Sequence, residues 1–416
     1  MNILTVIEML RFISPILIGI VLNQLTVPNE LLHQWEQVFF YQNAFSFAYL
    51  WAMSQIQLTL VPADPTYRSA LSMSNTLIAL PIASIVVFSL WTTFNNISIN
   101  VILFFFSFFL VNGQPIEYHF YSIHKYTKVL ITVLTTHFTA LLYVWIIYYW
   151  FTNEQPLLKA LIGLTLLHGV RTIVWWRIAP PLQSFQPVTK LIRHTFPLWG
   201  SYLLSGSALY VDGWLVERYL DADFFLYFRY GAREFPLSTI MASGLSASFA
   251  FYIAKEGIQH ESTKQWIQNK INRFQRIIFP ISIILLCFSH LLFGWFYQER
   301  YSASALFFDG FLLLTVSRVL FSQSYMLALC LQKKMLAVTV IEFLLHAALS
   351  TLLIPFYGWR AIVISTMCAY LFEKIAYIHL LHKQGFNYWS IHPVREFVLG
   401  SSLLVVTYLL KYIILS

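Results

Sequence analysis

Ionisable residues lie inside two apolar stretches that meet at a short acidic turn within residues 191–257. The first stretch holds Asp212, and the second holds Arg229, Arg233 and Glu234. A charged group costs about 2.5–3.5 kcal/mol at the centre of a bilayer, so proteins keep one there only where it faces a wet cavity or a partner. Arg229 and Arg233 share one helix face, where two guanidinium groups suit a pyrophosphate or a carboxylate. We expect these two helices to line a polar pathway.

Further charges at depth are candidates for the same pathway. Four more arginines could contribute to a cationic cavity: Arg11, Arg171, Arg193 and Arg318. For each of them, helix anchoring or ordinary bonding between helices is the alternative. Asp212 could bind a coupling cation or pair with Arg233, and we favour the pairing. We expect Glu234 to be the local ion-pair partner of an arginine.

Other polar groups give weaker signals. Glu342 and His346 are four residues apart and share a helix face, which we interpret as ordinary bonding between helices. Asp221 and Asp223 resemble an Asp-x-Asp motif of membrane glycosyltransferases, but an acidic residue before a helix is also an ordinary N-cap. No Walker A, Gly-x-Ser-x-Gly or His-Glu-x-x-His motif occurs. The three cysteines indicate neither a disulfide framework nor a metal site. We therefore expect a protein that is not an enzyme, with no metal and no cofactor.

The composition sets the class of protein that must position these residues. The 416 residues are 58% hydrophobic and only 11% charged, whereas soluble domains carry roughly 25% charged residues. This indicates a polytopic membrane protein. The net charge of +8 is explained by basic residues in cytoplasmic loops, so we expect no nucleic-acid partner.

Apolar runs long enough to cross a bilayer recur along the whole chain. We predict an all-α protein with about thirteen such helices, near residues 3–26, 36–58, 69–92, 98–123, 126–150, 156–178, 191–219, 222–254, 276–297, 304–332, 335–355, 359–382 and 393–415. Most basic residues then fall on alternate connections, which predicts a cytoplasmic N-terminus. Lys411 is among the few at predicted outer ends.

The helices divide into two sets of six and one more. Residues 10–15 and 192–197 are faintly similar, which indicates parallel repeats. Residues 179–190 are rich in proline and form the natural boundary. The predicted parts are a six-helix lobe over 1–182, a second over 183–385, and an additional helix within 386–416.

The pattern in residues 191–257 resembles a known family. A helix entered through a proline, Asp212 within it, a turn, an aromatic helix start and the sequence Gly-Ala-Arg-Glu-Phe-Pro-Leu at 231–237 resemble the seventh and eighth helices of the multidrug/oligosaccharidyl-lipid/polysaccharide (MOP) exporter superfamily. The segment 234–237 is similar to the lipid II flippase branch. That branch has an arginine three residues before the glutamate, where this chain has Gly231.

The resemblance implies two six-helix lobes around a cavity, and a flippase in the bacterial inner membrane. Its substrate would be an undecaprenyl-pyrophosphate-linked oligosaccharide for surface polysaccharide, bound by the arginines. Coupling could use a proton gradient, a sodium gradient or the membrane potential. We expect a monomer that works beside a polysaccharide polymerase. A lipid II flippase is the alternative, and a drug/cation antiporter ranks third. A glycan polymerase or glycosyltransferase is the alternative from another class, for which a long periplasmic loop would be expected.

Overall fold

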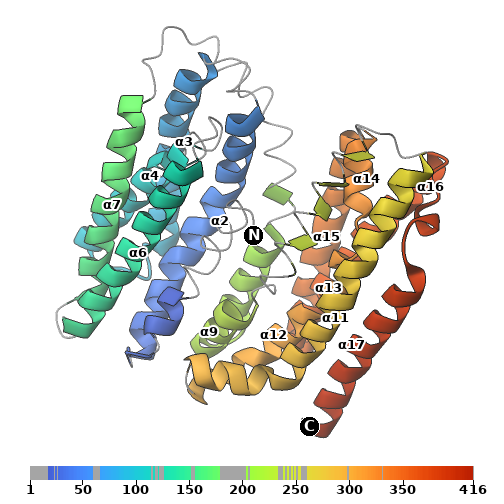
Figure 1. Cartoon of the computed structure of the whole chain (residues 1–416). Helices are drawn as coiled ribbons and strands as arrows, with labels where there is room; N and C mark the ends of the chain where they lie inside the picture. Colours follow the sequence, from blue (N-terminus) through green and yellow to red (C-terminus); the bar gives the residue numbers. More distant parts are fainter. Residues whose placement is uncertain are drawn as a thin grey trace. The chain divides into compact units, whose positions relative to one another are not determined.

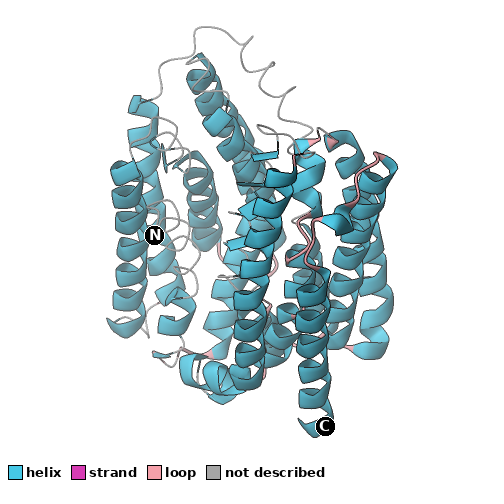
Figure 2. Cartoon of the chain, turned by 45° about the vertical axis from the view of Figure 1, so that its right-hand side comes forward, coloured by secondary structure: helices cyan, strands magenta, loops and turns pink. Residues whose placement is uncertain are grey.

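The computed structural model is helical, with no strand in the part of the chain that it describes (Figure 2). It describes residues 17–22, 24–25, 27–59, 66–113, 116–117, 120, 126–150, 155–178, 203–204, 207–232, 238, 241–242, 245–246, 248–249, 252–253, 260–297, 299–329 and 331–415. The expected all-α fold is therefore confirmed.

Two compact units make up the chain, Met1–Tyr210 and Val211–Ser416. The predicted linker, residues 179–190, lies outside the described residues. So do both segments of the predicted repeat, residues 10–15 and 192–197. The three-part division and the repeat stay predictions.

In the first unit, helices that follow one another in the chain run in opposite directions (Figure 1). They are α2 (Asn29–Thr59), α3 (Thr66–Leu90), α4 (Ile97–Gly113), α6 (Tyr126–Trp150) and α7 (Pro156–Ile178), so α4 and α7 run in the same direction. Helix α4 packs against both α3 and α7, while α2 packs on α3 and α6 on α7. Short connections favour the contacts of α2 with α3, α3 with α4 and α6 with α7, which are sequence neighbours. The contact of α4 with α7 instead joins helices on either side of α6 in the chain.

The second unit contains more and shorter helices. They are α9 (Ala222–Gly231), α11 (Glu261–Tyr297), α12 (Ser304–Leu312), α13 (Thr315–Arg318), α14 (Ser322–Ala328), α15 (Gln332–Tyr357), α16 (Trp359–Lys383) and α17 (Val394–Leu415), with 3-10 turns η1 (Glu299–Tyr301) and η2 (Tyr388–Ser390). Residues 207–219 are also helical. Helix α15 packs on α16, α11 on α17, and α12 on α9.

Apolar side chains cover the outside of the described helices, and polar ones are buried inside. Phe88 and Phe356 are each 82% exposed, whereas Gln42 and Asn75 are fully buried. Lipid rather than water is the solvent that suits such a surface. Six described helices are long and apolar enough to cross a membrane, and a bent pair, Ser304–Arg318 with Ser322–Ala328, would make a seventh. The chain is a multi-pass membrane protein.

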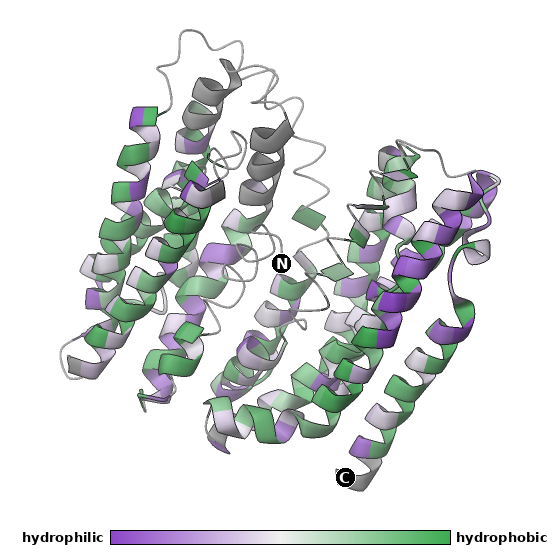
Figure 3. Cartoon of the chain, in the orientation of Figure 1, coloured by the Kyte–Doolittle hydropathy of each residue, from purple (hydrophilic) through white to green (hydrophobic). Residues whose placement is uncertain are grey.

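Helix α11 begins at Glu261, about four turns before the predicted apolar run at 276–297. Residues expected in a loop, among them Lys264 and Lys270, are therefore helical. The cause is a buried stripe that includes Ile267, Ile271 and Phe274 at helical spacing. Figure 3 shows this change along α11, from a mostly hydrophilic first half to a mostly hydrophobic second half.

The predicted helix over 304–332 is broken. Turns separate α12, α13 and α14, and the two parts of the span differ in direction by 44°. Breaks at membrane depth are tolerated where protein groups satisfy the freed backbone. Here hydrogen bonds between backbone groups three residues apart satisfy the freed groups, for example from Leu320 N to Ser317 O at 3.2 Å.

Candidate functional site

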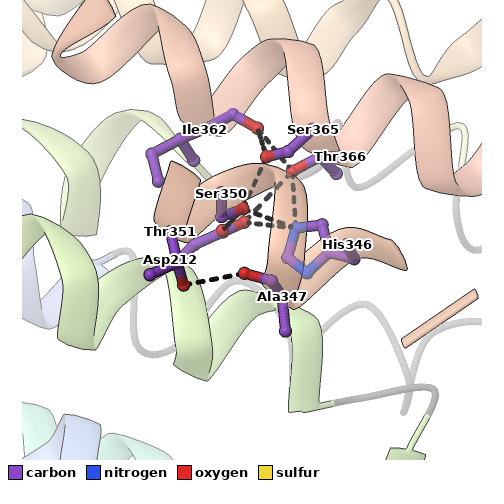
Figure 4. Close-up of polar contacts among 8 residues, drawn as sticks. All are labelled: Asp212, His346, Ala347, Ser350, Thr351, Ile362, Ser365 and Thr366. Carbon is purple, nitrogen blue, oxygen red and sulfur yellow. Dashed lines mark hydrogen bonds and ion pairs between the residues drawn. The ribbon is translucent and has the colours of Figure 1, made fainter. Parts of the chain in front are cut away.

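Asp212 lies in the helix over 207–219 and is 1% exposed. Its Oδ1 accepts a hydrogen bond from Ser350 Oγ at 3.0 Å, and its Oδ2 accepts one from Thr366 Oγ1 at 3.1 Å. Nε2 of His346 lies 3.2 Å from Oδ2. Figure 4 shows the carboxylate pointing toward side chains of both α15 and α16. Asp212 therefore links its own helix to both α15 and α16 by hydrogen bonds.

The partners of Asp212 also bond to each other. Ser350 Oγ lies 2.6 Å from Ser365 Oγ. His346 Nε2 lies 3.3 Å from Thr366 Oγ1 and 3.4 Å from Ser350 Oγ. None of these residues is more than 4% exposed. The result is one closed polar network within a candidate membrane span.

Spacing along α15 brings its polar residues to this network. Thr339, Glu342, His346 and Ser350 are three or four residues apart, so they share one helix face. Gly358 alone separates α15 from α16. Its φ of +54° is one that glycine adopts at little cost. The tight turn returns α16 antiparallel along that face.

The polar residues of the hairpin form what we call the α15–α16 seam. Its members are Thr339, Glu342, His346, Ser350, Ser365, Thr366, Glu373, Lys374 and Tyr377. Lys374 Nζ lies 2.6 Å from Glu373 Oε2, and Thr339 Oγ1 lies 3.3 Å from the Tyr377 hydroxyl. Glu342 is 3% exposed and lies within electrostatic range of His346, Glu373 and Lys374.

Acidic groups outnumber basic ones where the seam meets Asp212. Asp212 and the seam together hold three carboxyl groups, those of Asp212, Glu342 and Glu373, with one lysine and one histidine. Buried ionisable residues in a membrane span are candidates for a functional site. Among the described residues, no group of three or more His, Cys, Asp or Glu has an arrangement that could hold a metal ion.

Four of the predicted site residues lie outside the described part of the chain: Arg11, Arg193, Arg233 and Glu234. The pairing of Asp212 with Arg233 thus stays a prediction. The bonds of Asp212 to α15 and α16 were missed from the sequence. The shared face of Glu342 and His346 was the signal that pointed to them.

Arg229 is half-buried in the last turn of α9. Close by, Gly231 packs so tightly on α12 that an added Cβ would lie 2.0 Å from the Ser304 carbonyl oxygen. The position where the lipid II flippase branch carries an arginine therefore has no room for a side chain here. At the other end of α9, Asp221 Oδ1 accepts a hydrogen bond from Phe224 N at 2.9 Å. The interpretation of Asp221 as an N-cap is confirmed.

Arg318 ends the short helix α13, just before the 44° bend in this span. Its guanidinium carbon lies 5.5 Å from the centre of the Tyr370 ring on α16, within the range of a cation–π contact. Arg229, Arg318 and the seam all belong to the second unit.

Arg171 belongs to the first unit, where it forms a buried ion pair with Glu117. The side chains are 9% and 3% exposed. The charge of Arg171 is thus balanced within its own unit. The sequence had indicated Arg171 but not its partner, because the two residues are 54 positions apart.

Lys411 turns inward and bonds within the second unit. Its ammonium group donates to Leu286 O at 2.7 Å, to Ser289 Oγ at 2.6 Å and to Asp309 Oδ2 at 2.5 Å. The side chain of Lys411 is 12% exposed. The sequence predicted only that Lys411 lies at an outer helix end; the structure adds that it joins α17 to α11 and α12.

The chain is similar to solved structures of transporters along nearly its full length. It matches "Lipid II flippase MurJ, inward closed conformation" with a TM-score of 0.71 at 15% identity, over 98% of this chain and 92% of that one. It matches the eukaryotic MATE transporter AtDTX14 with a TM-score of 0.61 at 14% identity, over 97% and 96% of the two chains. It also matches an inward-facing multidrug resistance MATE family transporter of the MOP superfamily. The TM-score is 0.56 at 10% identity, over 95% of this chain and 94% of that one.

These identities establish the fold alone. The expected resemblance to the MOP exporter superfamily is confirmed at that level, and the structural neighbours are flippases and transporters rather than enzymes. No protein-family model matches the chain, and no curated protein matches it in sequence.

Proposed function

We propose that this chain is a MOP-type flippase of the bacterial inner membrane. It moves an undecaprenyl-pyrophosphate-linked oligosaccharide to the periplasmic leaflet for surface polysaccharide biosynthesis, as a monomer beside a polysaccharide polymerase. The observation that carries the proposal is a flippase-like fold over 98% of the chain, and the arginines that the sequence has within its apolar stretches support it. Arg229 and Arg318 lie in one unit, and in the proposal they and Arg233 supply guanidinium groups that suit a pyrophosphate.

In this proposal the arginines neutralise the pyrophosphate while the lipid tail stays in the bilayer. Arg11, Arg171 and Arg193 have a supporting role at the path of the headgroup, and the ion pair of Arg171 with Glu117 gives that residue a structural role as well. Asp212 and the seam provide coupling to an ion gradient. Movement of two lobes against each other alternates access to the site.

Lipid II is the second candidate substrate. The similarity to MurJ and the Glu-Phe-Pro-Leu segment at 234–237 favour it. Gly231 argues for a different headgroup contact, because its surroundings leave no space for an arginine at that position.

The test is transport of a fluorescent undecaprenyl-pyrophosphate oligosaccharide in proteoliposomes. Arg229→Ala, Arg233→Ala and Arg318→Ala should each lose transport, while Arg276→Ala, whose side chain is 67% exposed, should keep it. If all four variants keep transport, the headgroup must bind elsewhere in the protein. Transport of lipid II but not of the oligosaccharide would select the second candidate. Growth of the glycan on an added acceptor, without transport, would identify a polymerase instead.

A further inference from the structure

The connection from α16 to α17 folds back along α16 (Figure 1). Gly385 follows the last turn of α16 with a φ of +77°, which glycine adopts at little cost. Gly385 N donates to His382 O at 2.9 Å, and Phe386 N donates to Leu381 O at 3.1 Å. Together these two bonds form the Schellman motif that ends many helices. The chain reverses there, and η2 packs beside α16.

The turn η2 is held in place by buried side chains. Tyr388 is 2% exposed, and its hydroxyl lies 3.1 Å from Nδ1 of His392. Nε2 of His392 in turn lies 3.1 Å from Nε2 of Gln275 on α11. The ring of Trp389 packs edge-on against Tyr388 and His392, at 5.2 and 5.9 Å between centroids. The indole of Trp389 is therefore held in position, although it is 46% exposed.

A cavity of about 390 Å³ lies between η2 and the last turns of α16, a size typical of ligand sites. Its α16 side consists of Ile375, Ile378, His379 and His382, whose spacing places them on one helix face. Asn387 lines the cavity from the connection. Ile375 is 65% exposed and lies toward the middle of the span, whereas the histidines lie at its cytoplasmic end. The cavity therefore changes from apolar to polar in the direction from the bilayer to the cytoplasm.

The polar end of this cavity suits a phosphate group. The imidazoles of His379 and His382 and the amide of Asn387 supply N–H donors. Lys383 follows in the same last turn of α16 and is exposed, so its charge acts over a Debye length of about 8 Å. Among the described residues that line the cavity, none is acidic. The last carbonyl groups of α16 accept the bonds of the Schellman motif, which leaves the N–H donors to an anion.

The apolar end of the cavity suits a hydrocarbon chain. Ile375 and Ile378 continue the lipid-facing surface of α16 into the cavity. Trp389 lies at the boundary between the two ends, where tryptophan is enriched at membrane interfaces. A soluble anion would use only the polar end, and a hydrocarbon without a headgroup only the apolar end. A phospholipid uses both.

We propose that this cavity binds one anionic phospholipid of the cytoplasmic leaflet. Its phosphate accepts hydrogen bonds from His379, His382 and Asn387, and one acyl chain lies along Ile375 and Ile378. None of these residues belongs to the proposed headgroup site of the transported substrate, so the inference does not depend on the proposed function. The bound lipid stabilises the connection that joins α16 to α17 and α11.

The test is native mass spectrometry of the full chain in detergent, with phosphatidylglycerol added in steps. Phosphatidylcholine, which has no net charge, measures the preference for an anionic headgroup. Soluble glycerol 1-phosphate measures binding without an acyl chain. Undecaprenyl pyrophosphate, added as a competitor, distinguishes a phospholipid site from a docking site for the transported lipid.

Three changes alter separate parts of the site. The double variant His379→Leu with His382→Leu removes two donors, Trp389→Ala removes the aromatic wall, and Lys383→Gln removes the nearby charge. Exposed residues of the same types on α11 are the matched controls, as the variants His260→Leu and Trp295→Ala. Size-exclusion profiles verify that each variant is folded, and the comparison of ligands on the wild type needs no variant.

We expect the wild type to bind one phosphatidylglycerol about fivefold more tightly than phosphatidylcholine. The double histidine variant should bind it about tenfold more weakly, and Trp389→Ala should also bind it more weakly. Lys383→Gln should bind the two lipids equally, and the controls should match the wild type.

Three outcomes would overturn the proposal. The first is unchanged binding of phosphatidylglycerol in both the double histidine variant and Trp389→Ala. The second is equally tight binding of glycerol 1-phosphate, because the acyl chain would then contribute nothing. The third is displacement of phosphatidylglycerol by an equal amount of undecaprenyl pyrophosphate, which would identify a docking site for the transported lipid.

Discussion

Lys411 Nζ lies 2.5 Å from Asp309 Oδ2, and this ion pair fastens the last helix, α17, into the second unit. Both side chains are almost fully enclosed. Replacing Lys411 by methionine leaves the carboxylate of Asp309 buried without its cation, which costs about 3–5 kcal/mol. We expect a clearly lower melting temperature of the purified protein.

The double variant Lys411→Met with Asp309→Leu separates the pair from the packing around it. With both charges removed, most of the lost stability should return. Lys383→Met, at the exposed end of α16, is the control. If the double variant is less stable than Lys411→Met alone, the pair does not act as described.

Gly231 gives a second prediction, about the contact of α9 with α12. An added Cβ would lie 2.0 Å from a backbone oxygen, so Gly231→Ala must displace one of the two helices. We expect a loss of about 1–3 kcal/mol in the free energy of unfolding. At Gly169 the added Cβ would lie 3.6 Å from the Phe109 ring, an ordinary contact. Gly169→Ala should leave the melting temperature unchanged or raise it, and equal losses at both positions would contradict this account.

Variants of Arg171 test whether this buried arginine of the first unit has a structural role. Arg171→Met leaves the carboxylate of Glu117 buried without its cation. We therefore expect the free energy of unfolding to fall by about 3–5 kcal/mol. In the double variant Arg171→Met with Glu117→Gln, stability should recover in large part. Transport by the stable double variant then decides the role. Full activity assigns Arg171 to structure alone, and a stable but inactive protein assigns it to the headgroup path.

The buried side chain of His392 leads to a prediction of how the stability of the folded protein depends on pH. Its ring contacts Gln275 at 3.1 Å and the Tyr388 hydroxyl at 3.1 Å in the connection between α16 and α17. Burial lowers the pKa of His392 from 6.5 to about 4. Between these two values the unfolded chain binds a proton that the folded chain does not, so stability falls as the pH drops from 6.5 towards 4.

The magnitude of this effect is at most about 3 kcal/mol. Melting temperatures of the wild type and of His392→Gln, compared at pH 7 and pH 5, would measure it. The wild type should lose more stability than the variant on acidification. Parallel pH profiles for the two proteins would exclude His392 as the cause.

Sequence alone predicted helices well where one apolar run makes one helix. The predicted run over 156–178 and the helix α7 coincide, because lipid imposes a spanning length on such segments. The beginning of α11 was missed, since its first four turns bury only one stripe and do not form an apolar run. The breaks between α12 and α14 were missed because apolar residues continue through them.

Partners of the polar residues were harder to predict. Spacing places Glu342 and His346 on one face of α15, but it does not say which helix packs on that face. Asp212 bonds to Thr366, 154 positions later, and only the packing of three helices brings them together. Lys411 was predicted only to lie at an outer helix end, and that position does not reveal its contacts with Leu286 and Asp309.

The single-residue turn at Gly358 has a consequence for how the protein is made. Helices α15 and α16 leave the ribosome as adjacent segments. If each entered the bilayer alone, Glu342 in one and Glu373 in the other would each cost about 2.5–3.5 kcal/mol. Entering as a closed hairpin, the two helices shield these groups between them and Lys374 neutralises one of them. Asp212, synthesised earlier, is then already in the membrane to receive His346. The turn thus favours insertion of the two helices together over insertion of each helix alone.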